Sequence, residues 1–299
     1  MTSGPYGSQG TPAEANPPVC PRHTDRISYV RCQRCERPTC PECQRPAAVG
    51  ILCVSCVAEQ AAHSREAKTV FGAQVRQGRP IVTLSIIAIT LAVFLLQFIP
   101  GIDITDRLLY APALTLVEPW RLLTVSLVHS TGFILHVGLN MYGLWLFGQY
   151  LEPALGRWRF LILYLVSAIG GSVGVMALAD PNVAGSWYQP VVGASGAIFG
   201  LFGAMFVIQR RLGGPVRQIL VLIAINAVIG FVVPGIAWQA HLGGLITGAL
   251  AAAVLAYAPR KNRTAFQIGG IAAVFLLLGA AIAAKTALVP VTAPLILGL

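Results

Sequence analysis

Charge is scarce in this sequence. Only 11% of its 299 residues are Asp, Glu, Lys or Arg, whereas 56% are hydrophobic. Soluble globular domains carry about 25% charged residues. The composition therefore excludes an ordinary soluble protein and predicts that most of the chain lies in a membrane.

Acidic residues are the scarcer kind, with 11 Asp and Glu against 21 Lys and Arg, so the formal net charge is +10. Such a balance can indicate a nucleic-acid partner. The arginines, however, lie in short clusters between apolar runs, where membrane orientation explains them better. We therefore expect no nucleic-acid partner.

Cysteine is absent after Cys56, so the apolar part of the chain has no disulfide framework. The N-terminus lacks a basic start followed by an apolar core, and so does not resemble a signal peptide. Residues 1–19 are instead rich in Gly, Pro, Ser and Ala, which is typical of a disordered tail.

Seven apolar segments are long enough to cross a bilayer, which takes about 20 residues of helix. They cover approximately residues 80–99, 132–150, 158–178, 195–210, 216–233, 237–257 and 265–287. The sequence therefore predicts an all-α polytopic membrane protein.

Basic residues predict the orientation of these spans, because Lys and Arg accumulate in cytosolic loops. Four basic clusters fall on one side of the seven spans: Arg65, Lys68, Arg76 and Arg79; Arg157 and Arg159; Arg210, Arg211 and Arg217; Arg260, Lys261 and Arg263. On the opposite side, loop 179–194 carries Asp180 as its one charged residue. We expect a cell-membrane protein with a cytosolic N-terminus and an external C-terminus.

A serine and a histidine lie inside two of the apolar segments. Ser195 belongs to the sequence GASG and His241 to AHLGG, and the predicted orientation places both at similar depth in the outer half of the membrane. Ionisable residues are costly in hydrocarbon, so they mark candidate functional sites. A histidine that removes the serine proton would make the hydroxyl a nucleophile.

Glycines on both segments explain how the two side chains could meet. Small residues spaced one turn apart let membrane helices approach closely, and two such pairs occur, Gly196 with Gly200 and Gly244 with Gly248. Gly193 permits a turn that leaves backbone N–H groups free at the start of the serine helix. Taken alone, these glycines indicate only a tight helix crossing, whereas the Ser–His pair at matched depth favours catalysis.

The second span carries His136 and Asn140, which are spaced i, i+4 and so share one helix face. Their donors could bind the negative charge that develops when the serine attacks a carbonyl. Hydrogen bonding between helices is the alternative. His129, nearer to the loop, is expected to face water or lipid headgroups.

Together these motifs resemble those of the rhomboid family of intramembrane serine proteases. The matching residues are Trp120 and Arg121 in the first external loop, His136, Asn140, Gly193, Ser195, Gly196, Gly200, Ala240, His241, Gly244 and Gly248. Glu152 also resembles a family position, at the cytosolic end of the second span. The resemblance covers about residues 80–257 and implies a rhomboid-like six-helix core, with a seventh C-terminal transmembrane helix as in many members.

The resemblance implies an endopeptidase in which Ser195 is the nucleophile and His241 the general base and acid, with no cofactor needed for catalysis. His136, Asn140 and the Ser195 amide would donate to the oxyanion. Phe199 stands where some members have Tyr, so the ring is kept and the hydroxyl is lost. Substrates would be single-pass transmembrane proteins in the lipid bilayer. The rival classes are a catalytically silent relative that binds membrane clients, and a transporter.

All seven cysteines lie between residues 20 and 56. Together with His23 they form four ligand pairs with two-residue gaps: Cys20 and His23, Cys32 and Cys35, Cys40 and Cys43, Cys53 and Cys56. Eight ligands suffice for two tetrahedral zinc ions, and the gap lets both members of a pair bind one metal. Disulfides would suit a secreted chain rather than a cytosolic segment. The sequence therefore predicts a small N-terminal zinc-binding domain with two structural zinc ions.

The spacing of these pairs resembles B-box and RING-like cross-braced fingers, in which alternate pairs share a metal; sequential pairing is the alternative. Basic residues of the module could attract nucleic acid or anionic lipid, but we favour a cytosolic protein partner. The predicted organisation is a disordered tail over 1–19, the zinc-binding module over 20–57, a linker helix over 58–79, the six-span protease core over 80–257, and the seventh span with an external tail over 258–299.

Overall fold

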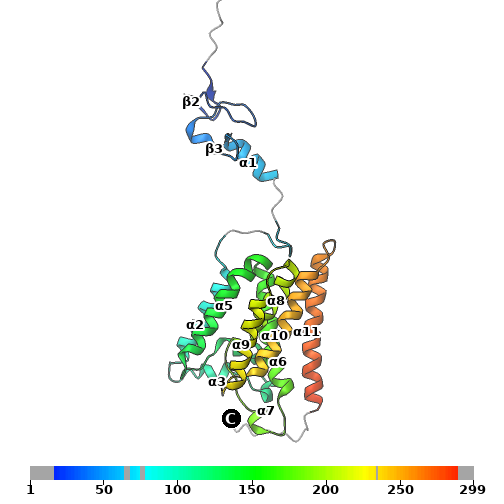
Figure 1. Cartoon of the computed structure of the whole chain (residues 1–299). Helices are drawn as coiled ribbons and strands as arrows, with labels where there is room; N and C mark the ends of the chain where they lie inside the picture. Colours follow the sequence, from blue (N-terminus) through cyan, green and yellow to red (C-terminus); the bar gives the residue numbers. More distant parts are fainter. Residues whose placement is uncertain (1–16, 64–67, 75–77, 234, 289–299) are drawn as a thin grey trace, which may run out of the picture. The chain divides into compact units, whose positions relative to one another are not determined.

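A computed structural model describes residues 17–63, 68–74, 78–233 and 235–288. The chain divides into two compact units, Met1–Glu66 and Ala67–Leu299 (Figure 1). Residues 1–16 of the predicted tail and residues 289–299 of the predicted external tail lie outside the described residues.

The first unit is built from two short β-hairpins and one helix. β1 (Val19–Cys20) pairs antiparallel with β2 (His23–Ile27), and β3 (Gln44–Pro46) pairs antiparallel with β4 (Ile51–Cys53). The 3-10 turn η1 (Pro41–Cys43) precedes β3, and α1 (Val54–His63) follows β4. Within the described part of this unit, the buried hydrophobic residues are all cysteines. So small an apolar core needs a further source of stability, such as a bound metal.

The linker predicted as one helix over 58–79 has a different structure. The helix ends at His63, and residues 68–74 form a turn closed by a bridge between Lys68 and Gln74. Residues 64–67 and 75–77 lie outside the described part of the chain. Phe71 and Ala73 of the turn are buried, and Phe71 belongs to the main core of the second unit. Tertiary packing of these two side chains therefore overrides local helix propensity.

Helices occupy all seven predicted spans, so the all-α fold class is confirmed. They are α2 (Ile81–Leu96), α5 (Ile134–Leu155), α6 (Arg157–Leu178), α8 (Ser195–Leu212), α9 (Arg217–Val232), α10 (Trp238–Tyr257) and α11 (Arg263–Ala287). Among the described residues, α6, α10 and α11 are long and apolar enough to cross a membrane by length and composition alone. Helices α2 and α9 are apolar but shorter.

Short helices fill the loops on either side of α5 and α6. Four lie between α2 and α5, namely α3 (Ile104–Leu108), η2 (Pro112–Leu114), α4 (Arg121–Thr124) and η3 (Val125–Leu127), and α7 (Ala184–Trp187) follows α6. The buried Arg121 holds the first loop together, because its guanidinium pairs with Glu118 and donates to the carbonyl oxygens of Asp106 and Leu109. Trp120, by contrast, is 54% exposed.

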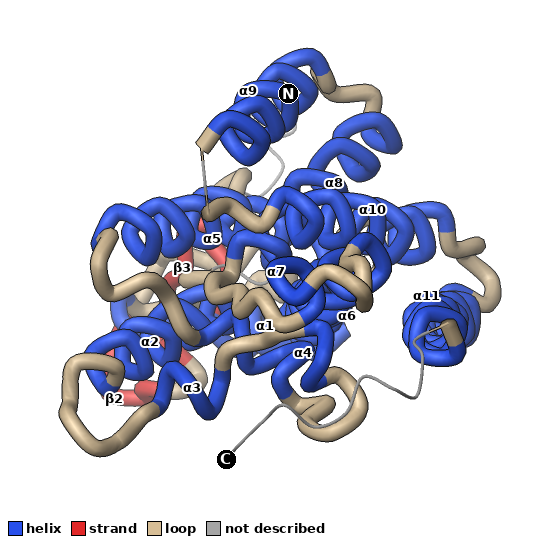
Figure 2. The backbone as a smooth tube through the Cα atoms, turned by 90° about the horizontal axis from the view of Figure 1, so that it is seen from below, coloured by secondary structure: helices blue, strands red, loops and turns tan. Residues whose placement is uncertain are grey.

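Helices α6, α8 and α10 make the most extensive contacts of the second unit, whereas α9 and α11 lie at its periphery (Figure 2). A methyl group on Gly244 would collide with the carbonyl oxygen of Gly196, and one on Gly248 with that of Gly200. The backbones of α8 and α10 therefore touch, as small-residue faces allow. This crossing brings the start of α8 against the start of α10.

Helix α2 is joined to the end of α5 by Glu152, a buried carboxylate. It accepts hydrogen bonds from the N–H groups of Val82 (3.0 Å) and Thr83 (2.8 Å) and from the Thr83 hydroxyl (2.8 Å). The first N–H groups of a helix have no partner within the helix and carry partial positive charge. Glu152 therefore caps α2 from a neighbouring helix.

Candidate active site and metal clusters

Ser195 is the first residue of α8, and His241 lies in the first turn of α10. Because the two helices cross at their glycine faces, Ser195 Oγ lies 2.9 Å from His241 Nε2. Both residues are partly buried. A hydroxyl in hydrogen-bond contact with an imidazole is the arrangement that base-assisted nucleophilic attack requires.

Phe199, one turn after Ser195, orients the imidazole of His241. The two rings stack with their centroids 4.0 Å apart and their planes 9° apart. His241 Nδ1 is buried and has no hydrogen-bond partner among the described residues. Stacking on Phe199, rather than a third polar residue, therefore sets the ring plane of His241.

Gly193 shapes the turn before Ser195. Its φ of +121° is one that residues with a Cβ rarely adopt, and its N–H donates to the Val125 carbonyl at 3.0 Å. A Cβ at this position would lie 2.7 Å from His136 Nε2. The glycine therefore leaves room for the His136 ring beside the start of α8, where no side chain of the described residues caps the helix.

His136 lies in the first turn of α5. Its Nδ1 accepts a hydrogen bond from the Ser130 N–H at 3.4 Å, so the proton of the neutral ring is carried by Nε2. This nitrogen is the one beside Gly193. His136 therefore presents a hydrogen-bond donor next to the turn that carries Ser195.

Asn140 lies one turn after His136 on α5 and is buried. Its Nδ2 donates to the His136 carbonyl at 2.7 Å. Its Oδ1 has no partner among the described residues. The hydrogen bond of Asn140 thus lies within its own helix, and one Nδ2 hydrogen remains for another acceptor.

His129 differs from its expected exposure to water or lipid headgroups. It is 1% exposed, and its Nε2 accepts a hydrogen bond from the Ala194 N–H at 3.3 Å. Its ring meets that of His136 edge to face, with centroids 5.1 Å apart. The side chain of Gln97, at the end of α2, binds both the N–H (3.0 Å) and the carbonyl (2.8 Å) of His129. These contacts turn the loop inward, and nothing in the local sequence indicates them.

The loop between α2 and α5 also holds the strand-like segment that precedes Ser195. Val191 donates to the Tyr110 carbonyl at 2.7 Å, and Tyr110 donates back to the Val191 carbonyl at 3.2 Å. Tyr110 is fully buried, and its hydroxyl is 2.8 Å from that of Thr115. Residues 191, 193 and 194 are therefore each tied to this loop, which fixes the backbone leading into Ser195.

The eight predicted metal ligands form two groups in the first unit. They are Cys20, His23, Cys40 and Cys43, and Cys32, Cys35, Cys53 and Cys56, with the ligand atoms of each group within 4.8 Å of one another. Alternate pairs along the chain share a group, so the arrangement is the cross-braced one. None of the seven cysteines forms a disulfide.

The spacing of the ligand atoms fits tetrahedral metal coordination. Cys35 Sγ lies 3.8 Å from Cys53 Sγ, and a tetrahedral zinc ion with Zn–S bonds of about 2.3 Å would hold its sulfur atoms about 3.8 Å apart. His23 Nδ1 lies 3.3 Å from Cys40 Sγ and 3.4 Å from Cys43 Sγ. Each cluster could therefore hold one metal ion.

The surroundings of the clusters also suit a metal. The Cys53 N–H donates to Cys32 Sγ at 3.2 Å, and backbone hydrogen bonds, chiefly from Cys40, lower the pKa of the Cys20 thiol to about 6. Burial instead raises the pKa of the Cys56 thiol to about 12, so a cation would have to stabilise that thiolate. His23 Nε2 faces Glu42 at 3.8 Å, as outer carboxylates commonly face metal-bound histidines.

Comparison with known proteins shows what part of the second unit is similar to. Residues 117–258, a range that contains Ser195, His241, His136 and Asn140, match the rhomboid domain family. The chain is 34% identical over 194 residues to rhomboid protease GluP of Bacillus subtilis (strain 168), covering 60% of this chain and 36% of that protein.

Two further relatives carry similar names. The chain is 33% identical over 157 residues to RHOMBOID-like protein 6, mitochondrial, of Arabidopsis thaliana, covering 50% of this chain and 48% of that protein. It is 27% identical over 220 residues to rhomboid protease AarA of Providencia stuartii, covering 63% and 77% of the two chains. The chain thus spans less than half the length of GluP and of RHOMBOID-like protein 6. The matched range, the helical fold and these relatives agree, and residues 117–258 therefore resemble a rhomboid domain.

Proposed function

We propose that this protein is an intramembrane serine endopeptidase that cleaves transmembrane protein substrates in the lipid bilayer. The contact of 2.9 Å between Ser195 Oγ and His241 Nε2, at the crossing of two apolar helices, is the observation that carries this proposal. The similarity to GluP and AarA, which are named rhomboid proteases, supports it.

In the proposed reaction, His241 Nε2 accepts the Ser195 proton while Ser195 Oγ attacks the scissile carbonyl carbon. The tetrahedral intermediate collapses to an acyl-enzyme, and the imidazolium gives its proton to the leaving amine. His241 then deprotonates a water molecule, which attacks the ester carbon. The bond between Ser195 Oγ and the acyl carbon breaks, and the imidazolium returns its proton to Ser195 Oγ. In all of these reaction steps the transferred protons move only between Ser195, His241, water and the two products.

The oxyanion of the intermediate would accept hydrogen bonds from the Ser195 N–H and from His136 Nε2. The uncapped start of α8 and the Nε2 tautomer of His136 support these two roles. Asn140 would supply a third donor through its remaining Nδ2 hydrogen. Removing one such donor from a soluble protease costs about 3–4 kcal/mol of transition-state stabilisation.

We also propose that the first unit binds two structural Zn²⁺ ions in the two four-ligand clusters. Bound zinc would replace the apolar core that this unit lacks, because metal-binding free energy stabilises such small domains directly. The basic clusters of the sequence further support a cytosolic N-terminus and an external C-terminus. In that orientation the zinc unit would bind a cytosolic protein.

The test uses the purified full chain in proteoliposomes with a single-pass transmembrane substrate that carries helix-destabilising residues. Ser195→Ala and His241→Ala should each abolish cleavage, and a fluorophosphonate probe should label Ser195 in the unchanged protein only. A silent client-binding relative would bind the substrate but leave it uncut. A transporter would show neither cleavage nor labelling, and either result would overturn the proposal.

A further inference from the structure

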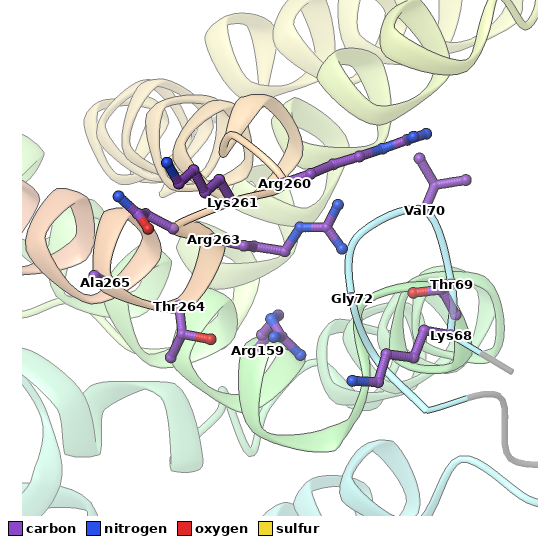
Figure 3. A pocket seen from close by; sticks show the side chains of 11 residues that line it. Lys68, Thr69, Val70, Gly72, Arg159, Arg260, Lys261, Arg263, Thr264 and Ala265 are labelled. Carbon is purple, nitrogen blue, oxygen red and sulfur yellow. The ribbon is translucent and has the colours of Figure 1, made fainter. Parts of the chain in front are cut away.

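A basic pocket lies outside the proposed active site, where the turn of residues 68–72 meets the starts of α6 and α11 (Figure 3). Its volume is about 670 Å³. Five of its lining residues are cationic, and none is acidic: Lys68, Arg159, Arg260, Lys261 and Arg263. All of them belong to the second unit.

The positive charge of this pocket is not neutralised within the described part of the chain. No Asp or Glu of the described residues forms an ion pair with any of the five cations. Arg159 donates from Nε to the neutral Gln267 Oε1 at 2.8 Å and from Nη1 to the Leu155 carbonyl at 3.4 Å. Like charges repel, most strongly where water is partly excluded. The pocket therefore favours a bound anion.

Packing, rather than chance, brings the lining residues together. Phe71 is buried in the core, and its carbonyl accepts a hydrogen bond from Gln267 Nε2 at 3.5 Å. The same amide donates to the Leu255 carbonyl at 3.0 Å. Gln267 therefore links the turn, α10 and α11, and also holds Arg159 of α6 through its oxygen.

The start of α11 adds polar groups to the pocket. Thr264 and Ala265 of its first turn line the cavity, and within the described part of the chain no side chain caps the helix at Asn262. Free N–H groups at a helix start bind anions. The cations and this helix start line the same cavity (Figure 3).

We propose that this pocket binds a phosphate group, carried either by the headgroup of an anionic phospholipid or by a soluble phosphate compound. Guanidinium groups bind phosphate oxygens in pairs of parallel hydrogen bonds. The pocket lies at the starts of α6 and α11, two helices that are long and apolar enough to cross a membrane. The ends of such helices lie in the lipid headgroup region. The proposal is independent of the protease reaction.

The test measures the melting temperature of the purified full chain in neutral detergent during titration with three additives. They are phosphatidylglycerol, phosphatidylcholine and sodium pyrophosphate. A ligand of the folded state raises the melting temperature in proportion to the logarithm of its concentration above its Kd. We expect a rise with phosphatidylglycerol, with pyrophosphate or with both, and none with phosphatidylcholine.

The two anionic arms distinguish the sources. A rise with phosphatidylglycerol alone identifies a lipid site, whereas a rise with pyrophosphate identifies a site for soluble phosphate compounds. The double variant Arg260→Gln, Lys261→Gln should weaken the binding about tenfold or more, since charged hydrogen bonds are lost. The matched control is Arg217→Gln, an exposed arginine at the start of α9 that does not line the pocket.

The proposal is overturned if neither anionic additive raises the melting temperature of the unchanged protein. It is also overturned if the additives raise the melting temperatures of the double variant and of the Arg217→Gln control equally, because the effect would then come from general surface charge. Added salt should weaken binding in the unchanged protein, as screening predicts.

Discussion

His129 accepts a hydrogen bond from the backbone N–H of Ala194 at 3.3 Å, across 65 positions of sequence. Ala194 immediately precedes the proposed nucleophile, and His129 is in turn held by Gln97. A residue that touches no reacting atom thus helps to position Ser195.

His129→Ala should slow substrate cleavage. The change leaves the Ala194 N–H buried without its acceptor, which costs about 1–3 kcal/mol, and it loosens the turn before Ser195. His129→Gln, which offers an amide oxygen, should recover part of the rate. The measurement is kcat/KM for the transmembrane substrate, together with the melting temperature. Equal rates for the alanine variant and the unchanged protein would show that this contact does not position Ser195.

Gly244→Ala should reduce cleavage by about 100-fold, the loss expected when a reacting group is displaced by about 1 Å. The new methyl group would collide with the Gly196 carbonyl and push α8 away from α10. Gly269→Ala on α11 is the matched control, since a Cβ there meets nothing within 4 Å. Probe labelling of Ser195 measures the same effect without a substrate, and should fall only in the first variant. Normal labelling of Gly244→Ala would contradict the close backbone contact between α8 and α10 at Gly196 and Gly244.

Glu152→Gln should lower stability by about 1–3 kcal/mol. The neutral amide can accept through one oxygen only, so part of the cap on Val82 and Thr83 is lost. The free energy of unfolding in detergent, from a denaturant titration, measures this. Asp103→Asn, which removes an exposed loop carboxylate, is the control and should change little. If both variants unfold alike, Glu152 is not the cap of α2.

The first unit should contain two zinc ions per chain by elemental analysis. Cys56→Ser should remove one of them, because it breaks one four-ligand cluster and leaves the other intact. Ser55→Ala, a change at the exposed neighbouring position, should retain both. Chelation should unfold this unit, seen as a loss of its protease resistance, while the second unit keeps its melting temperature. A metal content unaffected by Cys56→Ser would exclude the second cluster.

The parts of the fold that sequence predicts are those encoded locally. Apolar length located the seven helices, and the four-residue spacing of Gly196 and Gly200 indicated a close-packed face. The burial of His129 could not be predicted, since its partners Gln97 and Ala194 are distant in sequence. The prediction of a linker helix over 58–79 was wrong for the same reason, because Phe71 packs against core residues of the second unit that are distant in sequence.

The grouping of the metal ligands illustrates the same limit. All four pairs have the same two-residue gap, so spacing alone allows both sequential and alternate pairing. The Gln33 N–H donates to the Ile51 carbonyl at 3.0 Å, which sets the second pair against the fourth. This backbone contact belongs to the folded chain and leaves no pattern in the sequence.

Helix α2 lies outside the range that matches the rhomboid domain, yet hydrogen bonds connect both of its ends to that range. Glu152 holds its first turn, and Gln97 at its last turn holds the loop of His129. Only Thr83, Thr90 and Phe94 of this helix are buried, and lipid tails solvate an apolar helix as well as other helices do. Its place in the bundle is therefore set by polar contacts at both ends together with the packing of Phe94 in the core, so a change of the surrounding lipid should leave the helix in place.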